Sequence, residues 1–186
     1  LQQGSLKMKN WIWTHHDPDE NPEDWKPLFA QFKEAGVNNV VACVYNGRHA
    51  LFGSRHLAVA APLLEKMFPV AAAEGVELHA WIVTLQCNTD PVVEAHPEWF
   101  SVSRNGDSCL VKPPYIDSYR WLCPSHAEVR EHVDRTVAEL AAYSELTGIY
   151  LDYIRHPDVI LPEALQPKYD LVQDREFPEF DFCYCE

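Results

Sequence analysis

The chain has 186 residues, 47% of them hydrophobic and 12% aromatic, which fits one globular domain with a sizeable core and excludes a disordered chain. Its 15 basic and 28 acidic residues leave a formal net charge of −13, and no apolar run approaches the ~20 residues of a membrane helix. A surface this acidic repels phosphate, so we expect neither nucleic acid nor an anionic membrane as a partner.

Strand and helix signals alternate in the first part of the chain. A strand is predicted at residues 11–14, and Asn21 is expected to cap the helix that follows it. A second strand is predicted at residues 37–44. A helical region lies within residues 57–74, where Pro69 predicts a break or a fresh start.

The second part of the chain repeats the pattern with longer loops. A third strand is predicted at residues 76–85, and an irregular segment follows over residues 86–124. That segment is longer than a connector needs, and insertions of this size are usually functional. Ser125 and Glu128 have the spacing of a capping box, which predicts a helix start. A fourth strand begins at Gly148, and another long loop follows it.

Four strand–helix units of this kind predict a parallel sheet with right-handed crossovers. Long loops after the strands suit a (β/α)8 TIM barrel, in which the catalytic loops lie on the carboxyl face of the strands. Because such barrels need ~200–250 residues, we expect residues 1–186 to form a partial barrel domain with about the first four βα units, and the chain to be a fragment. The alternative is a complete, small doubly wound domain.

The start of the chain and its cysteines bear on its location. Residues 1–8 are expected to be an N-terminal extension without a signal-type apolar region, so a leader that was removed or trimmed would favour a periplasmic or extracellular location. Cys43 and Cys87 are expected as core thiols, whereas Cys109 and Cys123 flank a loop and are candidates for a disulfide. The terminal Cys-x-Cys supplies only two of the four ligands of a closed zinc site, so no metal is predicted.

The run from Gly148 to Pro157 is the most informative stretch of the sequence. Its near-continuous apolar residues predict a strand buried on both faces, and Asp152 is the one carboxylate inside it. An ionised carboxylate is costly to bury without a partner. An ion pair with Arg155 or a cap at the strand end would explain it without any function. The aromatic residue on each side of Asp152, and the Arg-His-Pro that follows, favour a functional carboxylate.

Parallel strands bring their carboxyl ends to one rim, where several polar and aromatic residues are expected to meet. Indole faces stacked on sugar rings, with amide, carboxylate and guanidinium groups meeting hydroxyls, describe a carbohydrate cleft. The residues predicted to contact the sugar are His16, Asn46, Trp81, Asn88, Arg155, His156 and Asp158. The tryptophans expected in or near the same loops are Trp11, Trp13, Trp81, Trp99 and Trp121.

Cleavage of a glycosidic bond needs two carboxyl groups. Asp152 is predicted to be the nucleophile or electrostatic stabiliser, and Arg155 is predicted to orient it. The sequence offers no convincing acid, so we expect the acid outside this chain and the chain alone to be inactive. The adjacent His15 and His16 point to opposite sides of a strand, which disfavours a catalytic metal, and no cofactor is predicted.

Several segments of the chain are similar to one known family. The run Gly148-Ile-Tyr-Leu-Asp-Tyr-Ile-Arg-His-Pro157 resembles the fourth-strand motif of the glycosyl hydrolase-like ten family, bacterial proteins often labelled family 10 glycosylhydrolases. Three further segments support the resemblance, which runs from about Lys9 to the last residue: Leu78-His-Ala-Trp81, His96-Pro-Glu-Trp-Phe100 and Leu122-Cys-Pro-Ser-His-Ala-Glu-Val-Arg130.

The resemblance implies a TIM barrel that hydrolyses polysaccharide, in some members the glycan strands of peptidoglycan. It also implies Asp152 as the nucleophile, a Glu from a later strand as the acid, and a cysteine-rich loop that opens at Cys183-Tyr-Cys185. Amylase-like enzymes carry an Arg two residues before the nucleophile, where this chain has Tyr150. The alternatives are a metal-dependent barrel hydrolase, such as a deacetylase or amidohydrolase, and a carbohydrate-binding protein without catalysis.

Overall fold

The computed structural model describes residues 8–88 and 90–185, so the expected N-terminal extension, residues 1–8, lies outside it except for Met8. Strands and helices alternate as the sequence predicts. In chain order the elements are β1 (Trp11–Thr14), α1 (Pro22–Glu34), β2 (Asn39–Tyr45), α2 (Leu63–Glu74), β3 (Glu77–Val83), α3 (Pro91–Glu94), η1 (Pro97–Trp99), α4 (Ala127–Ala141), β4 (Gly148–Asp152) and η2 (Glu163–Tyr169).

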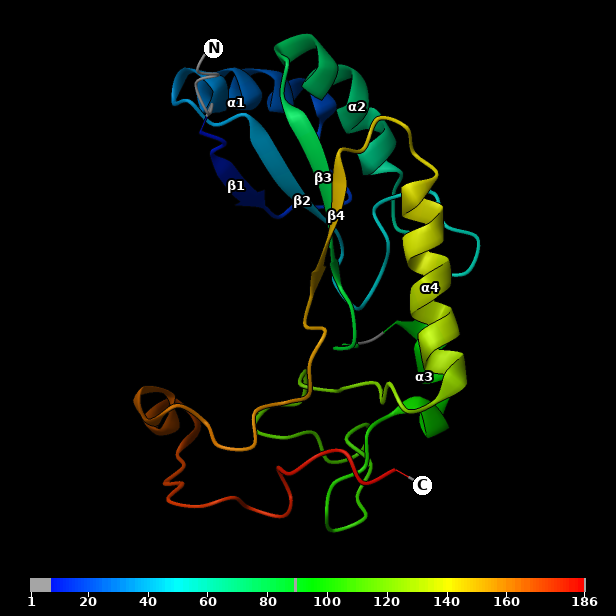
Figure 1. The fold of residues 1–186 in the computed structure, drawn as a ribbon, viewed down its shortest axis with the longest axis vertical. Coiled ribbons are helices and arrows are strands. Elements are labelled where there is room, and N and C mark those ends of the chain that lie inside the picture. The colour runs from blue at the N-terminus through cyan, green and yellow to red at the C-terminus, as the bar shows by residue number, and fades with distance from the viewer. Residues whose placement is uncertain (1–7, 89, 186) are drawn as a thin grey trace, which may run out of the picture.

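The four strands form one parallel sheet in the order β1-β2-β3-β4, so each strand pairs with the next in sequence (Figure 1). The register aligns Thr14 with Ala42, Ala42 with Ala80, and Val83 with Asp152. All four carboxyl ends therefore lie at one edge of the sheet. This confirms the predicted α/β fold and parallel sheet.

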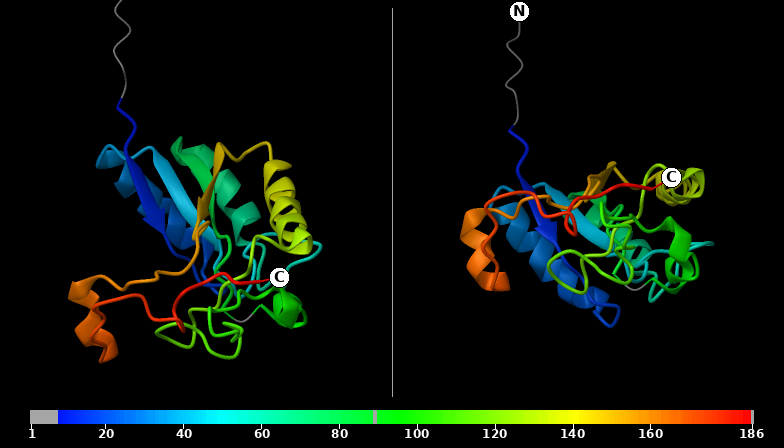
Figure 2. Two further views of the ribbon diagram at one scale, coloured as in Figure 1. Left: turned by 60° about the horizontal axis from the view of Figure 1, so that its bottom comes forward. Right: turned by 90° about the horizontal axis from the view of Figure 1, so that it is seen from below.

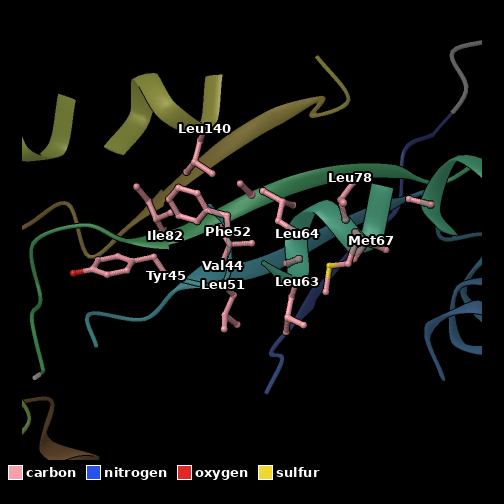
Figure 3. Close-up of a cluster of buried hydrophobic side chains, with 14 of the residues drawn as sticks. Val44, Tyr45, Leu51, Phe52, Leu63, Leu64, Met67, Leu78, Ile82 and Leu140 are labelled. Atoms are coloured by element: carbon pink, nitrogen blue, oxygen red, sulfur yellow. The ribbon is translucent and has the colours of Figure 1, made fainter. Parts of the chain in front are cut away.

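Helices α1, α2 and α4 lie on the same side of the sheet (Figures 1 and 2). The main core fills the space between them and includes the residues labelled in Figure 3. Its strand residues are alternate ones, such as Val40, Ala42 and Val44 of β2, because successive side chains of a strand point to opposite faces. A doubly wound domain places helices on both faces of its sheet, so the arrangement differs from that alternative.

A second core lies beyond the carboxyl ends of the strands, where the long loops meet. The loop after β3 contributes Trp99, Phe100, Trp121 and Leu122, and the C-terminal segment contributes Phe182. Isolated bridges join these loops, including Phe100 with Leu122 and Ser103 with Phe182. The irregular segments therefore form a packed layer of their own, which closes the lower part of the molecule in Figure 1.

Three local predictions were wrong. Helix α2 runs through Pro69 without a break, because the turns on both sides of it bury side chains against the sheet. The capping residue of α4 is His126 and not Ser125, and its side chain makes no capping hydrogen bond. Strand β4 is only partly buried, because it is the edge strand and one face of the sheet is uncovered.

The six cysteines are all free, so the disulfide considered for Cys109 and Cys123 is not formed. The Cys109 thiol bonds instead to the backbone of Trp121, donating to its carbonyl at 3.1 Å and accepting from its amide at 3.0 Å. Within residues 8–88 and 90–185, no helix is both long enough and apolar enough to cross a membrane.

Candidate active site

The face of the sheet opposite the helices carries a row of aromatic side chains, here called the open face and defined by Trp11, Trp13, Trp81 and Tyr150. Trp11, Trp13 and Tyr150 are 43%, 48% and 46% exposed, which is unusual for large apolar side chains on a central sheet. They alternate along their strands with the residues of the helix-covered core. The aromatic rings at the two edges of this face are therefore accessible, whereas Trp81 in its middle is buried in a small cluster with Val41 and Cys43.

Contacts across the open face show that the sheet is strongly curved. The rings of Trp13 and Tyr150 meet edge to face at 5.6 Å, although β1 and β4 are the two edges of the sheet. Three strand spacings separate these edges, about 14 Å in a flat sheet. The ring of Trp11 likewise lies 4.4 Å from that of His79, two strands away. The sheet thus curls around its aromatic face.

Asp152 ends β4 at this face, half-buried, with its carboxylate held by two donors. Trp81 Nε1 donates to Oδ2 at 3.1 Å, and the backbone amide of Tyr153 donates to Oδ1 at 2.8 Å. Tyr153 has a φ of +51°, a left-handed conformation that is strained for a bulky residue and is concentrated at functional sites. The carboxylate is therefore fixed in place at the carboxyl edge of the sheet.

The Cys43 thiol of β2 also lies near this carboxylate. Burial raises the pKa of Cys43 to about 11, with the negative charge of Asp152 contributing in the same direction. Cys43 is therefore a neutral thiol at physiological pH. In the described part of the chain, the groups that donate hydrogen bonds to the Asp152 carboxylate are an indole and a backbone amide, and they include no second carboxyl group.

The two adjacent histidines after β1 diverge, as the sequence predicts. The ring of His15 lies 4.7 Å from the ring of Trp81, on the open face. His16, which was predicted to contact the sugar, lies behind β1, where its ring bonds to Thr14 at 2.8 Å and to Glu20 at 2.7 Å. The structure therefore brings His15, and not His16, to the neighbourhood of Asp152.

Asn46 and Asn88 come together beyond the ends of β2 and β3. Asn88 Nδ2 donates to the Asn46 carbonyl at 3.2 Å, and Asn88 Oδ1 accepts from Gln86 at 3.1 Å. Asn46 Oδ1 accepts from the backbone amides of Arg48 and His49, which closes a tight turn. The Asn88 side chain thus holds the two loops together at the predicted rim, and the Asn46 side chain shapes its own turn.

Arg155 does not orient Asp152, contrary to the prediction from their spacing. Its guanidinium lies over the rings of Trp121 at 5.1 Å and Tyr153 at 5.4 Å. It also donates to Tyr119 at 3.3 Å and reaches Asp158 Oδ2 at 3.5 Å. Tyr119 donates to the same Asp158 oxygen at 2.8 Å, so these three polar groups form one cluster beside the strand end.

The remaining predicted residues separate into exposed and buried positions. His156 is exposed on the loop after β4. Trp99 and Trp121, expected near the sugar, are buried in the loop core instead. The sequence analysis did not single out Tyr150 and Cys43 as site residues. The sequence could have indicated both: Tyr150 lies two residues before Asp152 on the same strand, so it shares the face of Asp152, and Cys43 alternates with the core residues Ala42 and Val44 of its strand.

The site is a carboxylate at the carboxyl edge of a curved parallel sheet, beside an open aromatic face. The fold of the chain that carries it is similar to that of known carbohydrate enzymes. No protein-family model matches the chain, and no curated protein matches it. The family ten assignment therefore has no support from a family match, whereas solved glycoside hydrolases do share the fold.

Three solved structures describe this likeness. A hypothetical protein from Ruminiclostridium thermocellum aligns at a TM-score of 0.60 and 15% identity over 79% of this chain and 78% of its own. The GH36 α-galactosidase AgaA from Geobacillus stearothermophilus and the maltogenic α-amylase AmyB from Thermotoga neapolitana both align at 0.55 and 16% identity over 88% of this chain. The chain spans only 24% and 43% of the lengths of these two enzymes.

Proposed function

We propose that the chain is the N-terminal part of a (β/α)8 barrel glycoside hydrolase, with Asp152 as nucleophile or electrostatic stabiliser. The observation that carries this proposal is the position of the Asp152 carboxylate, half-exposed on the open face and held by Trp81 and the Tyr153 amide. Asp152 stands at the strand end where barrel enzymes hold their catalytic groups.

The curvature and layering of the sheet support the barrel part of the proposal. All three long helices cover one face, the strands follow sequence order, and edge-strand rings meet across the other face. An open twisted sheet would keep Trp13 and Tyr150 well apart, whereas a sheet on its way to closure brings them together. Four strands then form about half of the eight in a closed barrel.

In this proposal the chain supplies the negative charge of Asp152 and holds its carboxylate in position. Two hydrogen bonds direct the Asp152 oxygens, which suits a group that attacks or stabilises the anomeric carbon. The second carboxyl group that the reaction needs is proposed to be a Glu elsewhere in the protein. A metal-dependent mechanism built on His15 and His16 is disfavoured, because the two rings lie on opposite sides of β1.

The open face is the proposed sugar platform. Trp13, Trp81 and Tyr150 offer ring faces and edges, and His15 replaces His16 as the imidazole next to the substrate. The rim residues proposed to bind hydroxyl groups further from the scissile bond are Asn46, Asn88, Arg155, His156 and Asp158. The substrate class is an oligo- or polysaccharide, with cell-wall glycan as one candidate.

The test is the release of reducing ends by the full product of the gene, measured on α-galactosides, maltooligosaccharides and peptidoglycan strands. Asp152→Asn should keep the fold and the Trp81 hydrogen bond while lowering the rate by several orders of magnitude. Asp134→Asn, an exposed change on α4, is the matched control and should leave the rate unchanged. Equal rates for Asp152→Asn and wild type would remove Asp152 from the mechanism. Glycan binding without released ends would instead favour a non-catalytic carbohydrate-binding protein.

A further inference from the structure

A second cluster of chemically capable side chains lies in the loop layer, away from Asp152. Cys123 precedes α4 and is fully buried, and its sulfur lies 3.2 Å from the sulfur of Cys183 near the end of the chain. The ligand atoms of Cys123, His126 and Cys185 all lie within 4.8 Å of one another. Two thiols and one imidazole therefore converge, with the Cys183 thiol beside that of Cys123, from two segments that are 60 residues apart in sequence.

These distances suit a single tetrahedral metal ion. Zinc binds cysteine sulfur at about 2.3 Å and histidine nitrogen at about 2.0–2.1 Å, which puts neighbouring ligand atoms roughly 3.5–3.8 Å apart. The sulfur–sulfur distance of 3.2 Å and the 4.8 Å limit lie on either side of that range. The donors of Cys123, His126 and Cys185 are thus close enough to share one ion, and a rotation of the Cys183 side chain, whose sulfur contacts that of Cys123, would supply the fourth ligand.

His126 supplies an independent observation that a ligand belongs here. It occupies the capping position of α4, yet its side chain makes no capping hydrogen bond. Its Nε2 atom is buried and has no hydrogen-bond partner. A buried polar atom left unpaired costs about 1–3 kcal/mol, so native structures rarely keep one without a reason. A metal bound by the imidazole, with its other nitrogen bonded to water or protein, gives that reason.

Contacts other than those between the sulfur atoms fix the C-terminal segment in place. The Tyr184 amide donates to the Val102 carbonyl at 2.9 Å, and Phe182 pairs with Ser103. Arg104 forms an ion pair with Asp181, the residue before Phe182. The backbone on both sides of Cys183 is thus anchored to the loop after β3, which holds the Cys183 thiol beside Cys123 and the Cys185 thiol beside Cys123 and His126.

A disulfide is the competing explanation for two neighbouring thiols. A bond between Cys123 and Cys183 would use two of the four groups and would leave Cys185 and His126 without a purpose. The remaining cysteines do not compete for a shared partner, since the thiols of Cys109 and Cys87 are bonded to the backbone of Trp121 and Gly47, and Cys43 lies in the sheet. One metal ion accounts for all four groups at once.

We propose that Cys123, His126, Cys183 and Cys185 bind one Zn²⁺ ion in a closed structural site. Four protein ligands leave no position for water or substrate, so the ion is structural and not catalytic. Binding releases the thiol protons to solvent and ties the C-terminal segment to the start of α4. The ion would stiffen the layer that contains Trp121 and so supports Tyr153, next to Asp152. This proposal does not depend on the proposed glycosidase activity.

The experiment is metal analysis of the 186-residue chain, purified with a reductant and dialysed after addition of zinc chloride. We expect one zinc per chain, and a lower melting temperature after removal of the metal by a chelator. Cobalt chloride added to the metal-free chain should give thiolate-to-cobalt charge-transfer absorption. Cys185→Ser and His126→Ala should lose or greatly weaken metal binding, whereas Cys87→Ala, a thiol outside the cluster, should keep it.

Three results would overturn the proposal. One is a folded, reduced wild-type chain that retains neither zinc nor cobalt. Another is full metal content in Cys185→Ser. The third is a Cys123–Cys183 disulfide, found by peptide mass mapping, in chain isolated without reductant. The wild-type stoichiometry and the cobalt spectrum decide the matter even if a variant fails to fold.

Discussion

The two faces of the same sheet differ in their exposure to solvent. On one face, Val40, Ala42 and Val44 are at most 1% exposed beneath the helices. On the other, Trp11 and Trp13 stay nearly half-exposed and meet aromatic partners from other strands. Strand alternation produces both faces, but only one is needed to hold the domain together. An exposed aromatic surface on a folded domain marks a place for a ligand or a further part of the protein.

The largest expected difference between the faces is in stability. Phe52 lies fully buried in the helix-covered core (Figure 3). Phe52→Ala should lower the free energy of unfolding by about 3–5 kcal/mol, because it leaves a cavity in a packed interior. Trp13→Ala on the open face should cost about 1 kcal/mol, mainly its contact with Tyr150. Urea denaturation of both variants measures the contrast, and equal losses would mean that the open face is a structural core.

The second difference is in the response to pH, and it belongs to the helix-covered side. Burial lowers the pKa of His132 on α4 from 6.5 to about 4, with the nearby His56 acting in the same direction. The unfolded chain therefore binds more protons between these values, and stability should fall as the pH drops through that window. We expect wild type to lose about 1–2 kcal/mol more than His132→Phe between about pH 6.5 and pH 5. Parallel curves for the two proteins would refute the assignment.

A smaller effect tests the link between the open face and Asp152. Trp81→Phe keeps an aromatic ring but removes the N–H that bonds to Asp152 Oδ2. The loss of one hydrogen bond to a charged group is worth about 1.5–3 kcal/mol, so turnover should fall roughly tenfold to a hundredfold. Unchanged turnover would show that this hydrogen bond does not serve the reaction.

The sequence predicts the helix-covered face far better than the open one. Apolar periodicity and local punctuation placed all four strands, and Asn21 caps α1 as expected. The local pattern fails at Pro69, because tertiary packing on both sides of it outweighs one missing hydrogen bond. Features that depend on neighbouring residues, such as strand positions and the cap of α1, are thus predictable from the sequence.

Contacts between distant segments are not predictable in this way. Arg155 stands three residues from Asp152, yet its partners Tyr119 and Trp121 come from the loop after β3. Whether His15 or His16 faces the site depends on how the chain leaves β1, which composition does not specify. The cluster of Cys123 with Cys183 likewise appears only when the folded loops bring the two segments together.

The most direct test of the open face as a sugar platform uses the six tryptophans of the chain as internal probes. Indole N–H signals of ¹⁵N-labelled chain are followed by NMR while α-galactosides, maltooligosaccharides and peptidoglycan fragments are added in turn. We predict that one of these classes shifts the signals of the open-face residues Trp11, Trp13 and Trp81, and leaves in place those of Trp25, Trp99 and Trp121, which are buried in the helix-covered and loop cores. Shifts confined to the buried set, or none with any saccharide, would contradict the account.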